Sequence, residues 1–175
     1  MHTAAFRFVE RVVADRLGVF SEVVEIGSRN INGSVRQLFA ASASYLATDI
    51  TGGIGVDQIV DASDASALPA GSCDTVVCCE VLEHTPVAPI IRSAATWLRP
   101  GGNLIATMAT TGRAPHSAVD GGTLRAGEHY HNVTAEEMIT ALDAAGLLPI
   151  IVETNEATAD LYVFAWKPPA SLSDI

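Results

Sequence analysis

The chain has 175 residues, of which 49% are hydrophobic and 17% are charged, and this composition is typical of a folded globule rather than a disordered chain. The length favours one domain over residues 1–175, and no apolar run approaches the roughly 18 residues that a membrane span needs. The formal net charge is −10 and the Lys and Arg residues form no cluster, which argues against a nucleic-acid partner.

The leading segment and the cysteines bear on the compartment. Residues 1–18 predict an amphipathic helix, because Phe6, Val9, Val13 and Leu17 fall on one stripe. Acidic residues lie among the apolar ones, so the segment is not interpreted as a signal peptide. The three cysteines are an odd number without C-x-x-C spacing, which favours reduced thiols. Both observations favour a cytoplasmic protein.

The next stretch predicts a β-loop-α-β unit. Val23–Ile26 and Tyr45–Thr48 are short apolar runs that indicate buried strands, and the second ends in Asp49. Between them a polar, glycine-bounded turn leads into a helix that we expect to begin at about Asn32. Open α/β folds bind ligands at the carboxyl edge of the sheet, where this turn and Asp49 lie. The unit therefore predicts a nucleoside site.

The glycine pattern discriminates between nucleoside cofactors. A dinucleotide fingerprint requires G-x-G-x-x-G, because the backbone must approach a pyrophosphate. Counting from Gly27, the other two glycine positions hold Arg29 and Asn32, so the fingerprint is absent. S-adenosylmethionine has no phosphates, and it needs acceptors for its amino group and ribose hydroxyls and donors for its carboxylate. Glu25, Asp49 and the loop amides, with Arg29, can supply these groups.

The centre of the chain predicts further strands and a helix. Ile50–Gly55 is too short and glycine-rich for a crossover helix, so a third strand at Val56–Val60 follows a trimmed connection. Asp74–Cys79 is a nearly continuous apolar run, as expected at the centre of a parallel sheet. A helical stripe follows over Val87–Leu98, and Asn103–Ala109 predicts the fifth strand.

The last third begins with a long loop. Residues 110–133 are rich in Gly and Pro and leave the carboxyl end of a strand, so we expect a lid over a substrate. Thr134 then opens a helix with a capping box, and Gly146 ends it. Leu148–Val152 and Leu161–Trp166 predict two last strands, and residues 168–175 predict a frayed tail.

Several segments in order resemble the class I S-adenosylmethionine-dependent methyltransferases, in particular the small-molecule type 11 group. They are Glu25-Ile26-Gly27, Asp49, Asp64–Pro69, Cys73–His84 and Leu98–Gly102. The resemblance runs over about 23–167 and departs from the family at Arg29, which replaces the second glycine of the first motif. It implies a Rossmann-like three-layer α/β/α sandwich with a mostly parallel seven-stranded sheet and an antiparallel last strand.

The resemblance also implies which residues contact the cofactor. The positions that match are Glu25, Gly27, Ser28, Arg29, Asp49, Ile50, Asp64, Ala65, Glu80 and Val81. For the adenine, D-A-x-x-L-P spacing favours Asp64-Ala65, whereas the position after the third strand favours Asp61-Ala62, and we prefer the first pair. The leading helix either covers the cofactor, as often in the family, or packs on the edge of the sheet.

Methyl transfer needs a base only when the acceptor is protonated, as a hydroxyl or an activated carbon acid is. We expect His129 or His131 of the long loop to serve, with His2, His84 and His116 as the other histidines. Glu80, Glu83 and His84 form E-x-x-E-H, and a comparable motif takes part in binding a divalent ion in some members; a distant His129 would have to join these residues in this sequence. We expect transfer without metal, because the same residues can simply shape the cofactor pocket.

The expected function is methylation of a small-molecule O, N or activated C acceptor with S-adenosylmethionine. The first alternative is a non-catalytic cofactor-binding subunit that activates or scaffolds a partner, since the motifs depart from the pattern at Arg29 and Ile50–Gly55. A metal-dependent RNA 3′-terminal ribose methyltransferase and a nicotinamide-dependent oxidoreductase are weaker alternatives. The sequence leaves the acceptor and the oligomeric state open.

Overall fold

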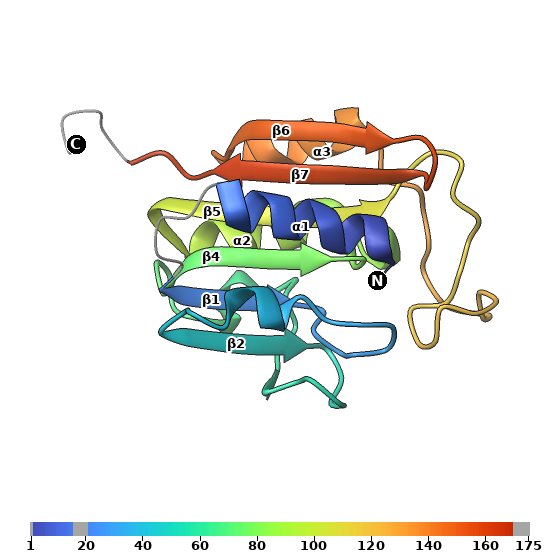
Figure 1. Ribbon diagram of the computed structural model, residues 1–175, viewed down its shortest axis with the longest axis horizontal. Coiled ribbons are helices and arrows are strands. Elements are labelled where there is room, and N and C mark those ends of the chain that lie inside the picture. The colour runs from blue at the N-terminus through green and yellow to red at the C-terminus, as the bar shows by residue number, and fades with distance from the viewer. Residues whose placement is uncertain (1, 16–20, 170–175) are drawn as a thin grey trace.

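A seven-stranded sheet organises the computed structural model, which describes residues 2–15 and 21–169 (Figure 1). The strand order is β3-β2-β1-β4-β5-β7-β6, and β7 runs antiparallel to both of its neighbours while the other pairs are parallel. The strands are β1 (Glu22–Ile26), β2 (Ser44–Asp49), β3 (Gln58–Ile59), β4 (Cys73–Cys79), β5 (Leu98–Ala109), β6 (Leu148–Asn155) and β7 (Asp160–Trp166). The predicted Rossmann-like fold class is confirmed.

Helices cover both faces of the sheet and give three layers (Figure 1). Helix α1 (Thr3–Asp15) lies on one face, and α2 (Val87–Trp97) and α3 (Ala135–Ala144) lie on the other. Successive residues of β4 serve different layers, because Val77 belongs to the α1 core and Val76 to the α2–α3 core. Both faces of β4 are therefore buried, which explains its continuous apolar sequence.

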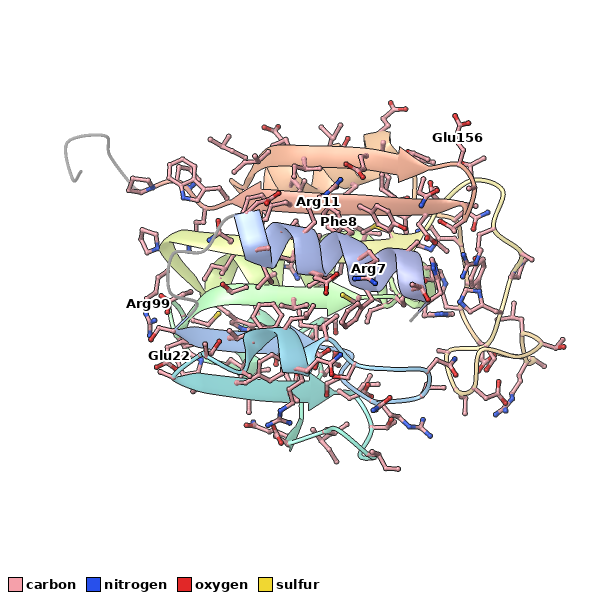
Figure 2. All side chains as sticks on the ribbon, viewed as in Figure 1. Arg7, Phe8, Arg11, Glu22, Arg99 and Glu156 are labelled. Carbon is pink, nitrogen blue, oxygen red and sulfur yellow. The ribbon has the colours of Figure 1, made fainter. Side chains whose placement is uncertain are left out.

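The leading helix packs on a face of the sheet rather than on its edge. Phe8 stacks on Tyr162 of β7 with ring centroids 5.0 Å apart. Arg7 and Arg11, both labelled in Figure 2, are more exposed; Arg7 pairs with Glu10 on α1, and the guanidinium of Arg11 lies over the Phe8 ring and pairs with Glu153 of β6. The predicted end of this helix at residues 16–18 lies outside the described residues, as does most of the predicted tail.

The prediction of a helix after β1 is wrong. The segment contains only a short 3-10 helix, η1 (Arg36–Phe39). Polar side chains before it bond the backbone as turns, since Asn30 Oδ1 accepts from the Gly33 N–H at 3.0 Å and Ser34 Oγ from the Arg36 N–H at 3.1 Å. Such bonds compete with helical ones. The apolar spacing that suggested a helix remains useful, because Phe39 is buried against the α1 core.

The trimmed connection between β2 and β3 has the predicted form, without a crossover helix. Strand β3 is shorter than expected, with two residues at the edge of the sheet. Asp57 fastens this connection to β2, because its N–H donates to the Ala47 carbonyl at 2.8 Å and its Oδ2 accepts from the Ala47 N–H at 3.0 Å. The backbone and the carboxylate of Asp57 thus hold the connection against β2.

The second half follows the prediction with small shifts of boundary. Strand β5 begins at Leu98, directly after α2, and so includes the Pro-Gly-Gly turn that was expected to precede it. The predicted cap of α3 is present, since Thr134 Oγ1 accepts from the Glu137 N–H at 3.1 Å. Strands β6 and β7 form the expected antiparallel pair. Within the described part of the chain, no helix is both long and apolar enough to cross a membrane.

Candidate functional site

A cavity of about 920 Å³ lies at the carboxyl ends of β1, β2 and β4. These strands point to one side of the molecule, and the loop of residues 110–133 lies on that side (Figure 1). Its first part, from Arg113 to Thr123, contributes residues to the cavity wall. The wall is therefore built from the ends of neighbouring strands on one side and from the long loop on the other.

The turn after β1 is held close to its neighbours. Gly27 has φ +75°, and a Cβ atom on it would lie 2.1 Å from Val81 Cγ2 at the end of β4. The N–H of Ser28 donates to the Thr48 carbonyl at 2.9 Å. Only glycine fits this position, because both its conformation and its distance from Val81 exclude a side chain.

Ser28 and Arg29 follow this glycine and line the cavity. The Ser28 side chain is buried, and its Oγ has no hydrogen-bond partner among the residues that the structure describes. Buried hydroxyls are normally paired, so this one is a ready partner for a polar ligand. The Arg29 side chain lies against Gly53 in the connection after β2, so the residue that replaces the second motif glycine also shapes the wall.

Two carboxylates stand at the ends of β1 and β2. Glu25 is 5% exposed, and burial raises its pKa from 4.5 to about 7, although the Tyr45 hydroxyl and Arg36 act in the opposite direction. Asp49 is half-buried; its Oδ2 accepts from the Arg29 N–H at 3.3 Å, and its Oδ1 accepts from the Thr51 N–H at 2.9 Å. Both residues line the cavity, with Ile50 on its exposed rim.

The preferred adenine pair lies elsewhere. Asp61 and Ala62 are part of the cavity wall, whereas Asp64 and Ala65 are not. Asp64 caps the 3-10 helix η2 (Ala65–Ala67), and the Ala65 carbonyl accepts a hydrogen bond from Trp97 Nε1 of α2 at 2.9 Å. The D-A-x-x-L-P segment thus turns toward α2, and the position directly after the third strand faces the cavity.

Glu80 and Val81 directly follow β4 and line the cavity. Glu80 has φ +58°, a left-handed conformation that costs a non-glycine residue roughly 1–2 kcal/mol. Its N–H donates to the Thr107 carbonyl at 2.7 Å, and its Oε1 accepts from Thr107 Oγ1 at 2.9 Å. Strained residues of this kind cluster at ligand sites, so the conformation supports a functional role for Glu80.

The histidines that face the cavity differ from the expected ones. His129 and His131 are not among its lining residues; they contact each other, with ring nitrogens 3.0 Å apart, and His131 Nε2 lies 3.3 Å from Glu137 Oε1. The lining histidines are His2, His84 and His116. The geometry therefore does not bring the two predicted bases to the cavity.

The E-x-x-E-H residues divide between two groups whose ligand atoms lie close enough to hold an ion. One consists of Glu83, His84 and His116, and the other of His2, Glu80 and Asp160. Glu83 is fully buried, and burial, followed by the charge of Glu80, raises its pKa to about 8. Burial and then His116 lower the pKa of His84. Glu80 and Glu83 thus belong to different groups.

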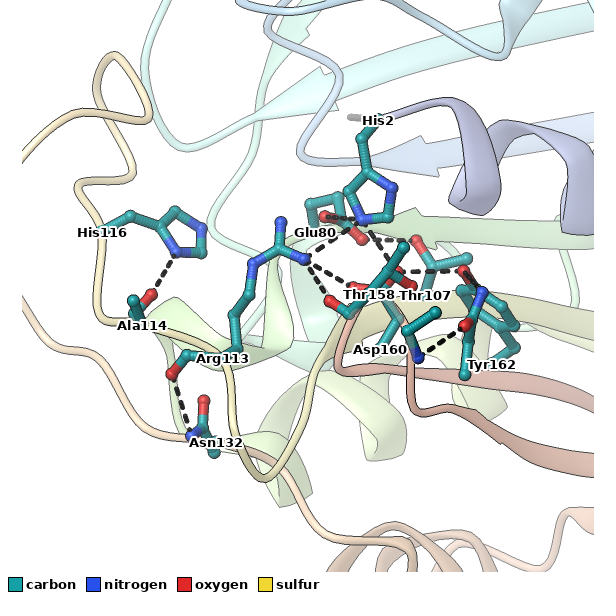
Figure 3. Close-up of polar contacts among 12 residues, drawn as sticks. His2, Glu80, Thr107, Arg113, Ala114, His116, Asn132, Thr158, Asp160 and Tyr162 are labelled. Atoms are coloured by element: carbon teal, nitrogen blue, oxygen red, sulfur yellow. Dashed lines mark hydrogen bonds and ion pairs between the residues drawn. The ribbon is translucent and has the colours of Figure 1, made fainter.

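A buried polar network borders the cavity at Glu80 (Figure 3). Its centre is Asp160, the first residue of β7, which is 0% exposed. Arg113 reaches it from the long loop at 3.1 Å, and His2 reaches it from the residue before α1 at 2.8 Å. Both His2 and Arg113 line the cavity, whereas Asp160 does not. This network was missed in the sequence, where its members lie far apart.

Comparisons with known proteins define the class. The family model described as a methyltransferase domain matches residues 1–150, so the chain belongs to the methyltransferase-domain family. A protein named ubiquinone biosynthesis O-methyltransferase from Xanthomonas euvesicatoria pv. vesicatoria is 34% identical over 131 residues, covering 69% of this chain and 52% of that protein. Its namesake from Ralstonia nicotianae is 34% identical over 89 residues, covering 50% of this chain and 37% of that protein. This chain spans about half the length of the Xanthomonas relative.

Solved structures share the fold. A Burkholderia thailandensis 1,6-didemethyltoxoflavin-N1-methyltransferase, solved with its acceptor and S-adenosylhomocysteine, has a TM-score of 0.69 at 15% identity and covers 95% of this chain and 79% of its own. An S-adenosylmethionine-dependent methyltransferase from Mesorhizobium loti has a TM-score of 0.68 at 19% identity, covering 93% of this chain and 97% of its own. At these identities the likeness establishes the fold alone.

Proposed function

We propose that this chain is an S-adenosylmethionine-dependent methyltransferase that acts on a small-molecule acceptor. The observation that carries the proposal is the meeting of Gly27, Asp49 and Glu80 on one cavity, at the ends of neighbouring strands. These strands flank the point where the sheet order reverses, which is where open α/β folds bind nucleotide-like ligands. Membership of the methyltransferase-domain family supports the same reaction.

The residues around the turn suit the parts of this cofactor. Asp49 would accept the ribose hydroxyls, and Glu25 with the loop N–H groups would hold the amino-acid end. Ser28 Oγ, buried on the cavity wall without a described partner, offers one further hydrogen bond. Gly27 and Val81 let the strand ends approach each other, and Arg29 and Ile50 complete the wall. We assign the adenine to Asp61 and Ala62 in place of Asp64 and Ala65.

S-adenosylmethionine supplies a methyl group that is already activated as part of a sulfonium cation. The carboxylates of Asp49 and Glu80 on the wall favour a cation there. The chain's own task is to position an acceptor and to remove its proton where it carries one. The Arg29 side chain occupies the wall where a dinucleotide would need a bare backbone, which favours this cofactor over a nicotinamide one.

We also propose that transfer proceeds without a metal ion. Glu80 and Glu83 belong to separate groups of side chains, so E-x-x-E-H does not form one set of ligands. Glu83 is fully buried and is not a lining residue, and its raised pKa favours the protonated form, which is a poor metal ligand. Activity that disappears with EDTA and returns with Mg²⁺ or Mn²⁺ would overturn this part of the proposal.

The acceptor side supports a small molecule. The wall opposite the cofactor residues consists of loop residues between Arg113 and Thr123, and we infer that this loop is a lid over the acceptor. The net charge of −10 disfavours a polynucleotide. Relatives named for O- and N-methylation are consistent with a small acceptor. Because the described cysteines are all free, we also propose a cytoplasmic location.

A heat-shift comparison of S-adenosylmethionine, S-adenosylhomocysteine and NAD tests the cofactor. A ligand at about 100 times its Kd adds roughly 2.7 kcal/mol to stability, so the first two should raise the melting temperature and NAD should not. The Asp49→Ala variant, checked for folding by circular dichroism, should bind S-adenosylmethionine about 1.5–3 kcal/mol more weakly in calorimetry. A shift with NAD alone would overturn the proposal.

A further inference from the structure

A histidine–aspartate pair stands where the long loop meets the strand ends (Figure 3). The Nε2 atom of His2 lies 2.8 Å from Oδ2 of Asp160 and 3.9 Å from Oε2 of Glu80. His2 and Glu80 line the cavity, and Asp160 lies directly behind His2, fully buried. The pair therefore connects the cavity wall to the interior of the protein.

Asp160 is surrounded by hydrogen-bond donors. Its Oδ1 accepts from Arg113 Nη1 at 3.1 Å, and its Oδ2 accepts from Thr158 Oγ1 at 2.7 Å and from the Tyr162 hydroxyl at 2.9 Å, in addition to His2. The guanidinium of Arg113 can only donate, and both hydroxyls are able to donate, so the oxygens of Asp160 are placed as acceptors. The same holds for the contact with His2.

This contact favours one tautomer of His2. At 2.8 Å from Asp160 Oδ2, Nε2 is placed to donate to the carboxylate, and Arg113 Nη1 lies at the longer distance of 3.4 Å from the same nitrogen. In the neutral imidazole the lone pair then lies on Nδ1, and no hydrogen bond to His2 Nδ1 occurs among the described residues. Of the lining histidines, His2 is the one with a buried carboxylate at hydrogen-bond distance, as far as the described residues go. It has the arrangement of a histidine prepared to accept a proton.

We propose that His2 is the catalytic residue that accepts the proton of a hydroxyl acceptor, and that Asp160 is its positioning residue. This inference rests on the proposed methyltransferase function and narrows the acceptor to a hydroxyl compound with an acidic proton, such as a phenol. It transfers to His2 the role that the sequence suggested for His129 or His131, because those residues do not line the cavity.

The proposed transfer conserves atoms and charge. The acceptor oxygen forms a bond to the methyl carbon while its proton passes to His2 Nδ1. The bond between that carbon and sulfur breaks, and its electron pair remains on sulfur. The products are a methyl ether, S-adenosylhomocysteine and a His2 imidazolium, which returns its proton to water. Glu80 and Asp160 face this imidazolium and Arg113 lies 3.4 Å from Nε2, so the surroundings carry one net negative charge that the imidazolium neutralises.

Long-range ¹H–¹⁵N spectra of the ligand-free protein test the pair without any turnover. A tag at the C-terminal end leaves His2 in place. The wild type should show His2 protonated on Nε2, and Asp160→Asn should change this pattern. Asp74→Asn is the matched control, since Asp74 pairs with Arg99 at 2.8 Å, and Arg99 lies at the opposite end of the strands from the long loop (Figure 2). A proton on Nδ1 in the wild type, or the same pattern in Asp160→Asn, overturns the inference.

Transfer to catechol and to 4-nitrocatechol tests the base itself. The nitro compound ionises far more readily, so it needs no base. His2→Ala should lower kcat for catechol by about 10²–10⁴-fold and leave kcat for 4-nitrocatechol within several-fold of the wild type. Equal losses with both probes would mean a structural role, and no loss with either would mean no role; each overturns the inference. Failure to bind S-adenosylmethionine, with the expected His2 tautomer intact, overturns the proposed function and this inference with it.

Discussion

Val81 at the end of β4 lies so near Gly27 at the end of β1 that a Cβ atom on the glycine would come within 2.1 Å of Val81 Cγ2. The two residues thus determine how closely the ends of the central strands approach each other beside the cavity. Because Gly27 also has φ +75°, the position combines two separate restrictions that mutation can distinguish.

Gly27→Ala should destabilise the protein by about 2–5 kcal/mol, combining roughly 1–2 for the left-handed conformation with roughly 1–3 for overpacking. Gly146→Ala is the matched control, since Gly146 has φ +71° but nothing within 4 Å of its added Cβ. This variant should lose only the stability that the left-handed conformation costs. Urea denaturation measures both. Adding Val81→Ala to Gly27→Ala should restore the overpacking part; no restoration would contradict the contact.

Asp61 and Asp64 offer a matched pair for locating the adenine. Each accepts from the N–H and the hydroxyl of the serine two residues ahead, at 2.9 and 2.7 Å in both cases, so their loss should perturb local structure alike. Since Asp61 lines the cavity and Asp64 does not, Asp61→Ala should weaken S-adenosylmethionine binding by about 1.5–3 kcal/mol and Asp64→Ala by much less. Calorimetry measures the affinity of both variants for S-adenosylmethionine and so locates the adenine. A larger loss in Asp64→Ala would return the adenine to the D-A-x-x-L-P segment.

Glu25 should make stability depend on pH. Burial raises its pKa from 4.5 in the unfolded chain to about 7 in the folded protein, so the folded state binds the proton more tightly. Its contribution is intact below pH 4.5 and is lost as the pH rises to 7, to a total of about 3 kcal/mol. Glu25→Gln should therefore be more stable than the wild type at pH 8 by up to this amount.

The measurement is the difference in urea midpoint between Glu25→Gln and the wild type at several pH values. Other groups titrate in both proteins, so their effects cancel in the difference. The difference should grow between pH 4.5 and 7 and then level off. A difference that does not change with pH would show that burial of Glu25 does not raise its pKa.

Trypsin tests the lid. The loop has two cleavage positions, and Arg125 has the more exposed side chain, at 53% against 28% for Arg113, which Asp160 holds. We expect cutting first after Arg125 in the free protein, and slower cutting with S-adenosylhomocysteine and catechol. Asp160→Asn should add a cut after Arg113. Mass spectrometry of the fragments over time measures the rate of each cleavage. Equal cleavage rates with and without ligand would contradict a closing lid.

The sequence predicted those parts of the site whose signals are local. Glu25, Asp49 and Glu80 each stand at the end of an apolar run, and parallel strands bring such ends to one edge. The prediction of a helix after β1 was wrong because side chains such as Asn30 and Ser34 accept hydrogen bonds from the backbone in turns. Apolar spacing alone does not reveal these bonds.

The histidines could not be ranked from the sequence, because loops have no periodicity that orients a side chain. His129 and His131 were favoured as histidines of the long loop, yet they are not among the residues that line the cavity. His2 depends on a partner, Asp160, that comes near the other end of the chain. An acidic residue directly before a strongly apolar strand was the one available signal, and it gave no indication of its partner.

The position of β7 has a consequence for how the chain folds. The first helix packs on a strand that is synthesised late, since Phe8 of α1 stacks on Tyr162 of β7. Contacts between segments this distant in sequence slow folding, because a long loop must close before they form. During synthesis α1 has no complete surface to dock on until β7 emerges, so His2 cannot reach Asp160 before then. A chain cut short before Asp160 could retain the Gly27 turn and still lack the histidine pair.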